Sequence, residues 1–330
     1  MSTADLWYQA IAGDLGLLQA IHRATEEFCR IPPSSDDPLS VDIPSSVEDV
    51  HLSPTGTWCL WAYSVFAAEL FDADYRSPDI TTFPNHVDML QSLLADDPQN
   101  RVAANAGTAE ALVVLGLWLD HSRRAGSLES EKIDFLAYHH LLTLIAVFHP
   151  SISVRNASTT LAGLVLHSYP DDGERVRVLE DLLENCVFAS LQACAVSWLR
   201  EELIMAQQTG QQSIFSSAEA IERVQYVLFP DLLWLKDAEG EAIEEYWTSN
   251  YLFLLQVANF AYFLFGSQYK HLVPQGMGAA IEERYVEPLR SAAKKLLLAL
   301  SPEKSEEPKV EGLDQMQVEI LLDRLQSITL

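Results

Sequence analysis

The sequence predicts an all-α protein built from stacked helix pairs, about six to seven of them. Apolar residues recur at helical spacing along most of the 330 residues. No stretch alternates apolar and polar residues over several β-branched positions, which is the pattern of a strand. From residue 97 onward, short turns containing Asp or Pro separate the helical segments. With 48% apolar residues the chain can bury a large core, so we expect a single helical-repeat domain over residues 1–330.

The first part of the chain predicts helices on both sides of a proline-rich loop. Residues 2–30 place small and apolar residues at helical spacing. Residues 31–57 contain five prolines, a density that blocks both helix and central strand, so a long loop is expected there. An aromatic-rich helix over 57–71 follows. Pro84 then opens a short helix to Leu94, because proline is tolerated in a first helical turn.

The rest of the chain predicts a series of amphipathic helices. In one of them, Val176, Leu179 and Leu183 form an apolar stripe. Ser216 and Glu219 have the spacing of a capping box at a helix start. The charged segment 301–312 predicts a linker. Helices are expected at residues 100–119, 131–148, 152–168, 173–186, 188–207, 241–265 and 279–300. A terminal amphipathic helix is expected at 313–328, with an apolar stripe of Leu313, Met316, Ile320 and Ile328.

Two segments open alike and suggest a repeat. Residues 97–104 and 150–157 each place a proline turn before a Val/Arg pair and a small residue. This resembles the opening of a HEAT-type helix. HEAT and armadillo units span about 40–47 residues, so the chain has room for about seven helix pairs. We therefore expect a HEAT/armadillo-like helical-repeat solenoid, with an irregular helical bundle as the alternative.

The charge of the chain restricts its partners. It carries 47 acidic and 21 basic side chains, for a formal net charge of −26. Residues 1–120 hold 18 acids and 4 bases, and residues 121–330 hold 29 and 17. Contacts to nucleic-acid phosphates and to anionic lipids need Lys and Arg, so neither nucleic acid nor membrane is an expected partner.

The first twenty residues lack the basic region and apolar core of a secretory signal. The most apolar stretch, 251–265, is shorter than the roughly 20 residues of a bilayer span and predicts a buried helix. A cytoplasmic location is expected, with the nucleus as a second one.

The chain offers little for catalysis. It has no P-loop, nucleophile elbow, zinc-protease motif or dinucleotide fingerprint. Adjacent His139 and His140 point about 100° apart on a helix, so they cannot easily share one metal ion. Catalytic residues, cofactors and metals are therefore not expected. Cys186 and Cys194 lie eight residues apart on consecutive helices and keep a redox or hydrolytic enzyme as a remote alternative.

Residues 148–204 resemble a known family. The likeness rests on His149-Pro150, Val154-Arg155, Tyr169-Pro170 and the run AVSWLREE over 195–202. The segment is similar to the family that groups glomulin with proteins binding a bZIP oxidative-stress transcription factor. The resemblance implies a non-enzymatic helical-repeat adaptor. Such relatives bind the transcription factor or mask the RING subunit of cullin-type ubiquitin ligases.

A basic protein surface is the expected partner, because an acidic surface accelerates encounter with a basic one. The basic region of a bZIP factor or a positively charged RING protein would both qualify. We expect Trp198 and Phe188 to be buried and the charged end of their helix to be solvated. The terminal helix is an interface candidate because it follows a charged linker, although it can equally cap its own repeat. The candidate partner-binding residues are Leu313, Met316, Ile320, Arg200, Glu201 and Glu202.

Overall fold

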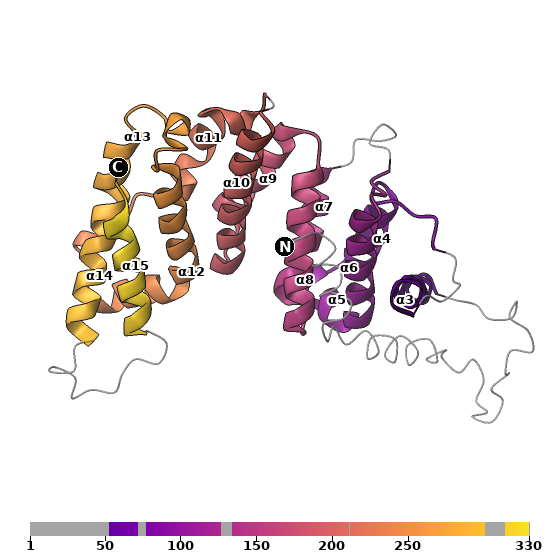
Figure 1. Cartoon of the computed structure of the whole chain (residues 1–330). Helices are drawn as coiled ribbons and strands as arrows, with labels where there is room; N and C mark the ends of the chain where they lie inside the picture. The colour runs from indigo at the N-terminus through magenta and orange to yellow at the C-terminus, as the bar shows by residue number, and fades with distance from the viewer. Residues whose placement is uncertain (1–52, 72–76, 127–133, 211, 301–313, 330) are drawn as a thin grey trace, which may run out of the picture. The chain divides into compact units, whose positions relative to one another are not determined.

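The computed structural model describes residues 53–71, 77–126, 134–210, 212–300 and 314–329 (Figure 1). Every regular element in these ranges is helical, and no strand occurs within them, so the all-α prediction is confirmed there. The chain forms two compact units, Met1–Ser168 and Tyr169–Leu330. The expected helix over 2–30, most of the proline-rich loop at 31–57 and the linker at 301–312 lie outside the described residues.

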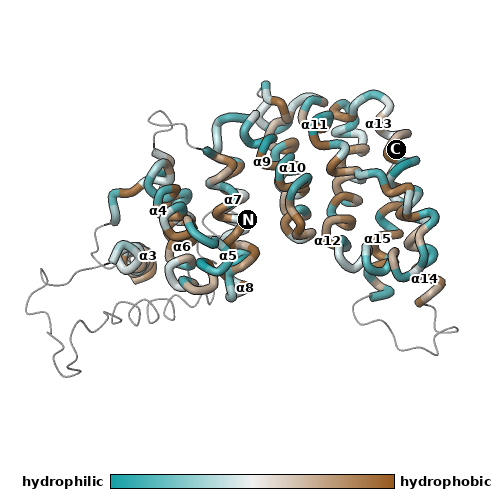
Figure 2. Tube along the Cα trace, turned by 180° about the vertical axis from the view of Figure 1, so that it is seen from behind, coloured by the Kyte–Doolittle hydropathy of each residue, from teal (hydrophilic) through white to brown (hydrophobic). Residues whose placement is uncertain are grey.

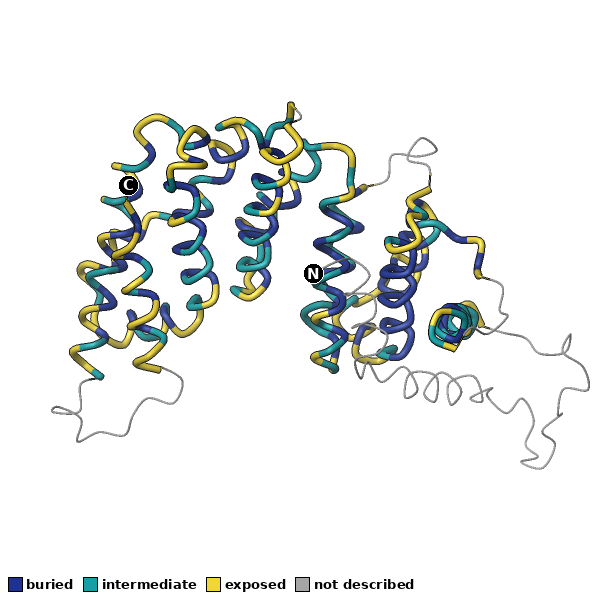
Figure 3. Tube along the Cα trace, in the orientation of Figure 1, coloured by how far each residue is buried: buried dark blue, intermediate teal, exposed yellow. Residues whose placement is uncertain are grey.

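The first unit is organised around one buried helix. Helix α6 packs against α3, α4 and α8, and α7 packs against α8. Nearly the whole length of α6 is buried (Figure 3). At Gly116 a Cβ would lie 2.5 Å from Leu161 Cδ2, so glycine is what allows α8 to approach this closely. The helices are α3 (Pro54–Phe71), α4 (Asn85–Leu94), α5 (Pro98–Ala104), α6 (Ala106–His121), α7 (Phe135–Phe148) and α8 (Ile152–Ser168).

A buried histidine joins three of these helices. The Nε2–H of His86 donates to the Leu112 carbonyl at 2.8 Å, and the Tyr138 hydroxyl donates to His86 Nδ1 at 2.9 Å. Burial lowers the pKa of His86 to about 4, and the hydrogen bond to Leu112 opposes this only in part. The imidazole is therefore neutral at physiological pH and holds α4, α6 and α7 together.

The prediction of one helix over 100–119 is wrong. Asn105 leaves the helical conformation, with φ −118° and ψ 42°, and α5 and α6 meet there at a 96° bend. The Asn105 side chain donates to the Arg101 carbonyl at 3.1 Å, a local bond that competes with continuation of the helix. Among the described helices, none alone has the length and hydropathy to cross a membrane, and the bent α5–α6 pair meets that test by length and composition only.

The second unit contains two layers of helices. Helices α10, α12 and α15 lie side by side, α9 packs against α10 and α11, and α14 packs against α12 and α15 (Figure 1). Hydrophobic and hydrophilic segments alternate along these helices, as expected of helices that bury one face (Figure 2). The helices are α9 (Asp172–Asn185), α10 (Ala189–Thr209), α11 (Glu219–Leu228), α12 (Gly240–Leu264), α13 (Met277–Ile281), α14 (Glu287–Leu300) and α15 (Gln315–Ser327).

Details of the second unit differ from the sequence prediction. The stripe of Val176, Leu179 and Leu183 is buried as predicted. The predicted capping box at Ser216 and Glu219 is wrong. A short 3₁₀ turn, Ile214–Ser216, precedes α11, and the capping box pairs Ser213 with Ser216 on that turn. Helix α11 begins at Glu219, whose N–H donates to the Ser217 hydroxyl instead.

Candidate functional site

Helix α10 contains the predicted partner-binding residues Arg200, Glu201 and Glu202, and the structure separates them. Glu201 is exposed and Arg200 is half-buried. The Glu202 side chain is only 2% exposed, so the expectation that it is solvated is wrong. It lies 3.1 Å from Arg175 Nη1 of α9 and forms an ion pair with it. Glu202 therefore joins two helices of its own unit and does not present itself to a partner.

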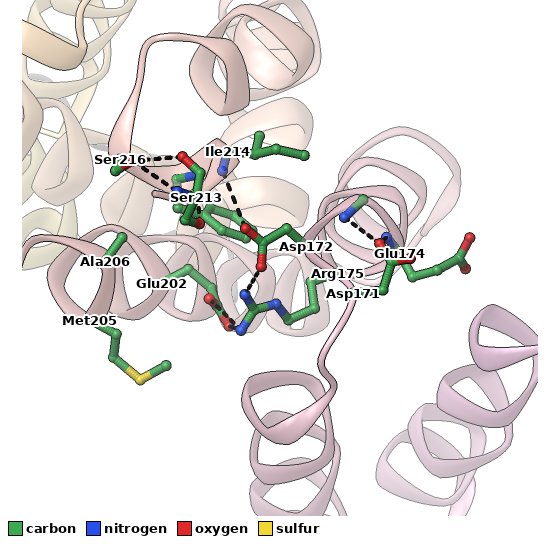
Figure 4. Close-up of polar contacts among 12 residues, drawn as sticks. Asp171, Asp172, Glu174, Arg175, Glu202, Met205, Ala206, Ser213, Ile214 and Ser216 are labelled. Atoms are coloured by element: carbon green, nitrogen blue, oxygen red, sulfur yellow. Dashed lines mark hydrogen bonds and ion pairs between the residues drawn. The ribbon is translucent and has the colours of Figure 1, made fainter. Parts of the chain in front are cut away.

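The ion pair belongs to a polar cluster at the start of α9 (Figure 4). Arg175 also pairs with Asp172, and its guanidinium lies over the Phe215 ring at 5.3 Å. Asp172 Oδ2 accepts the Ile214 N–H at 3.2 Å. The cluster thereby fixes α9, α10 and the 3₁₀ turn against one another.

The contacts of this cluster lower the pKa of Asp172. Burial raises the pKa of Asp172, but hydrogen bonds from Ser213 and Arg175 and the charge of Arg175 outweigh it, so the net shift is downward. Asp171, the residue before α9, accepts N–H bonds from Gly173 and Glu174 and caps the helix. These charged side chains bond to other groups of the same unit, so we assign the cluster a role in stability.

The two aromatic predictions for α10 differ in outcome. Trp198 is buried as predicted. Phe188 is 39% exposed, so its predicted burial is wrong. It precedes the first turn of α10, and its backbone is extended, so it is not part of the buried helical stripe.

Helix α15 packs onto its own unit through a face that differs from the predicted stripe. Val318, Leu321 and Leu325 are buried against α14 and α12, and Arg290 of α14 donates to the Leu325 carbonyl at 2.8 Å. Asp314 caps the helix by accepting the Met316 N–H at 3.0 Å. Ile328, the last member of the predicted stripe, is buried.

Two of the three partner-binding residues predicted on α15 are exposed. Met316 is 63% and Ile320 is 43% exposed, and they lie one helical turn apart on the side away from α14. The third, Leu313, lies outside the described residues. Helix α15 therefore packs on its unit through one face and exposes apolar residues on the other face.

Helix α12 adds two exposed apolar residues that the sequence prediction missed. Leu252 and Tyr262 each expose about half of their surface, although the stretch 251–265 was expected to be buried. The sequence contains one sign that α12 has a solvent-facing side, because the polar residues Gln256 and Asn259 interrupt its apolar run. Gln256 donates to the Ser197 hydroxyl of α10 at 2.8 Å and so lies at the edge of the buried face.

Helices α12 and α15 run parallel. Burial and then the negative charge of Asp314 raise the pKa of Tyr251, which places these two residues near each other. The Arg324 guanidinium lies 5.3 Å from the centre of the Tyr262 ring. The two contacts follow the same order along both helices, so α12 and α15 lie side by side in the same direction. We call their exposed apolar residues, Leu252, Tyr262, Met316 and Ile320, the α12–α15 face.

The layer that contains this face is acidic. Helices α10, α12 and α15 carry seven acidic residues and two arginines, with no lysine. Helix α14, on the other layer, carries one glutamate against Arg290, Lys294 and Lys295. The layer of α10, α12 and α15 therefore has an excess of acidic side chains, of which Glu202 is already paired with Arg175 of α9.

The thiols of Cys186 and Cys194 lack the lowered pKa that is typical of a redox-active cysteine. Burial raises the pKa of Cys186 and also that of Cys194, whereas a reactive cysteine needs a lowered pKa. In the part of the chain that the structure describes, no group of three or more His, Cys, Asp or Glu side chains is placed to hold a metal ion.

Comparison with known proteins identifies the family. A family model described as "Uncharacterised protein family, YAP/Alf4/glomulin" matches residues 7–324. The chain belongs to the YAP/Alf4/glomulin family. The match extends well beyond residues 148–204, on which the sequence resemblance rests, and includes all of the α12–α15 face. No curated protein and no solved structure matches the chain. Membership in the YAP/Alf4/glomulin family suggests a protein-binding adaptor.

Proposed function

We propose that this chain is a non-enzymatic adaptor that binds a bZIP transcription factor in the oxidative-stress response, in the cytoplasm or nucleus. The observation that carries the proposal is the acidic layer of α10, α12 and α15 with its exposed apolar residues. Apolar anchors supply most of the affinity at a protein interface, and complementary charge speeds association and selects the partner. Helix pairs stacked as in a HEAT-like solenoid would provide the extended surface for such binding.

A salt titration with a purified bZIP factor tests the proposal. The full chain is immobilised, and the factor is passed over it with increasing NaCl. We expect binding that weakens steeply as salt rises, because charge attraction is screened over about 10 Å at 0.1 M. The same factor without its basic region is the matched control and should bind much less. If the intact factor shows no salt-sensitive binding, the proposal fails.

A second candidate is masking of the RING subunit of a cullin-type ubiquitin ligase. The same acidic surface favours it, since a positively charged RING face is also complementary to it. A reconstituted cullin–RING ubiquitination reaction with an excess of the chain tests this candidate. Inhibition that increases with chain concentration supports it, and an unchanged reaction rate rejects it.

A further inference from the structure

The α12–α15 face is long enough to hold a helix. Leu252 and Tyr262 are ten residues apart on α12, which corresponds to about 15 Å along the helix axis. Met316 and Ile320 lie beside them on the parallel helix α15. About three helical turns of a partner fit along this length. Because α12 and α15 satisfy their backbone hydrogen bonds internally, the face offers no strand edge for an extended peptide to pair with.

Acidic side chains border the apolar part of the face. Glu319 and Asp323 are exposed and lie three residues after Met316 and Ile320, so each adjoins one of the apolar side chains. Arg324, the one basic residue of α15, is stacked on Tyr262. A partner whose apolar stripe is bordered by Lys and Arg would therefore match both the apolar centre and the acidic border.

Residues 1–52, residues 301–313 and a second copy of the chain are the other occupants to consider. Residues 1–52 carry nine acidic and two basic side chains, and residues 301–313 carry four acids and two lysines. A second copy of the chain carries the same net charge of −26. Each of these occupants has a net negative charge, and like charge on both sides disfavours an interface.

We propose that the α12–α15 face binds an amphipathic helix of another protein, with apolar residues on one side and Lys or Arg beside them. The inference rests on the proposed adaptor function and specifies the surface and the partner segment that it uses. The partner helix places its apolar residues at i, i+3 or i+4 and i+7 against Leu252, Tyr262, Met316 and Ile320.

A designed peptide tests the inference with the full chain. The probe is a fluorescent helix of about 18 residues with Leu on one face and Lys and Arg on its flanks. We expect saturable binding in fluorescence anisotropy. A matched peptide with Glu in place of every basic residue should not bind, and one with a central proline should bind at least tenfold more weakly because its helix is broken. Equal binding of all three peptides would overturn the inference.

Variants locate the binding surface. The double variant Met316→Glu, Ile320→Glu places charge on exposed positions, so the fold is retained, which circular dichroism verifies. We expect its Kd for the basic peptide to rise at least tenfold. The control is Leu298→Glu, which changes an apolar residue of α14 that is 69% exposed. The Kd of this variant should stay within twofold of that of the unchanged chain. An unchanged Kd in the double variant, or an equal loss in the control, would refute the location.

The two proposals fail in different ways. If the bZIP factor binds the chain and the Met316→Glu, Ile320→Glu variant binds it equally well, the adaptor function stands and the α12–α15 face is wrong. If the basic peptide binds at the face and the bZIP factor does not bind the chain at all, the face stands and the proposed function is wrong.

Discussion

Removal of the Glu202 carboxylate should destabilise the second unit strongly. Glu202 and Arg175 are 2% and 12% exposed, so Glu202→Ala leaves the Arg175 charge in a site with little access to water. Loss of one partner of a buried ion pair costs about 3–5 kcal/mol. Because Arg175 keeps Asp172 as a second partner, we expect the lower end, about 3 kcal/mol.

A second ion pair on α9 provides the matched control. Arg177 and Glu174 lie 3.2 Å apart, but their side chains are 50% and 33% exposed. An exposed pair of this kind contributes about 0.5 kcal/mol, so Glu174→Ala should change stability little. Each variant replaces a glutamate that is paired with an arginine of α9, and the two pairs differ mainly in how deeply they are buried.

Thermal unfolding followed by calorimetry measures the difference. For a unit of this size, a loss of about 3 kcal/mol lowers Tm by roughly 6–12 °C. The double variant Arg175→Met, Glu202→Leu should recover part of that loss, because neither charge of the buried Arg175–Glu202 pair remains. Equal Tm values for Glu202→Ala and Glu174→Ala would refute the reasoning, since they would mean that burial of the pair has no energetic consequence.

Three further predictions concern other parts of the chain. Gly116→Ala forces a Cβ to within 2.5 Å of Leu161, so the free energy of unfolding from urea titration should fall by about 1–3 kcal/mol. The pKa of His86 is lowered from 6.5 to about 4, so its contribution to stability is complete above pH 6.5. That contribution, about 3 kcal/mol, should be lost as the pH falls from 6.5 to 4, and His86→Gln should flatten the pH dependence of Tm. Cys186 and Cys194 have raised pKa values, so iodoacetamide should alkylate both at pH 7.4 more slowly than it alkylates glutathione, as mass spectrometry would measure.

Periodicity in the sequence predicts where helices occur and which stripes they bury. The stripe of Val176, Leu179 and Leu183 is an example, because local spacing alone determines that these side chains share a face. The break at Asn105 was not predicted, since it depends on one side chain that bonds to the Arg101 carbonyl in place of helix continuation. Sequence patterns give element types more reliably than element boundaries.

The candidate surface was predicted in part. Met316 and Ile320 are exposed, but the sequence pattern placed them on a stripe with Ile328, which is buried. The predicted stripe and the buried stripe of Val318, Leu321 and Leu325 are both compatible with an amphipathic helix. Contact with α14 determines which of the two is buried. The burial of Glu202 was missed because its partner, Arg175, is 27 residues earlier in the chain. Such pairs depend on how helices pack together, which spacing within one helix does not reveal.

The packing of α15 has a consequence for quality control in the cell. A chain that stops before Asp314 would lack Val318, Leu321 and Leu325, and the apolar surfaces of α12 and α14 that they cover would be in water. Large uncovered apolar patches promote aggregation and attract chaperones and proteases. A late truncation would therefore lower the cellular amount of the protein, even though every helix before α15 is still encoded.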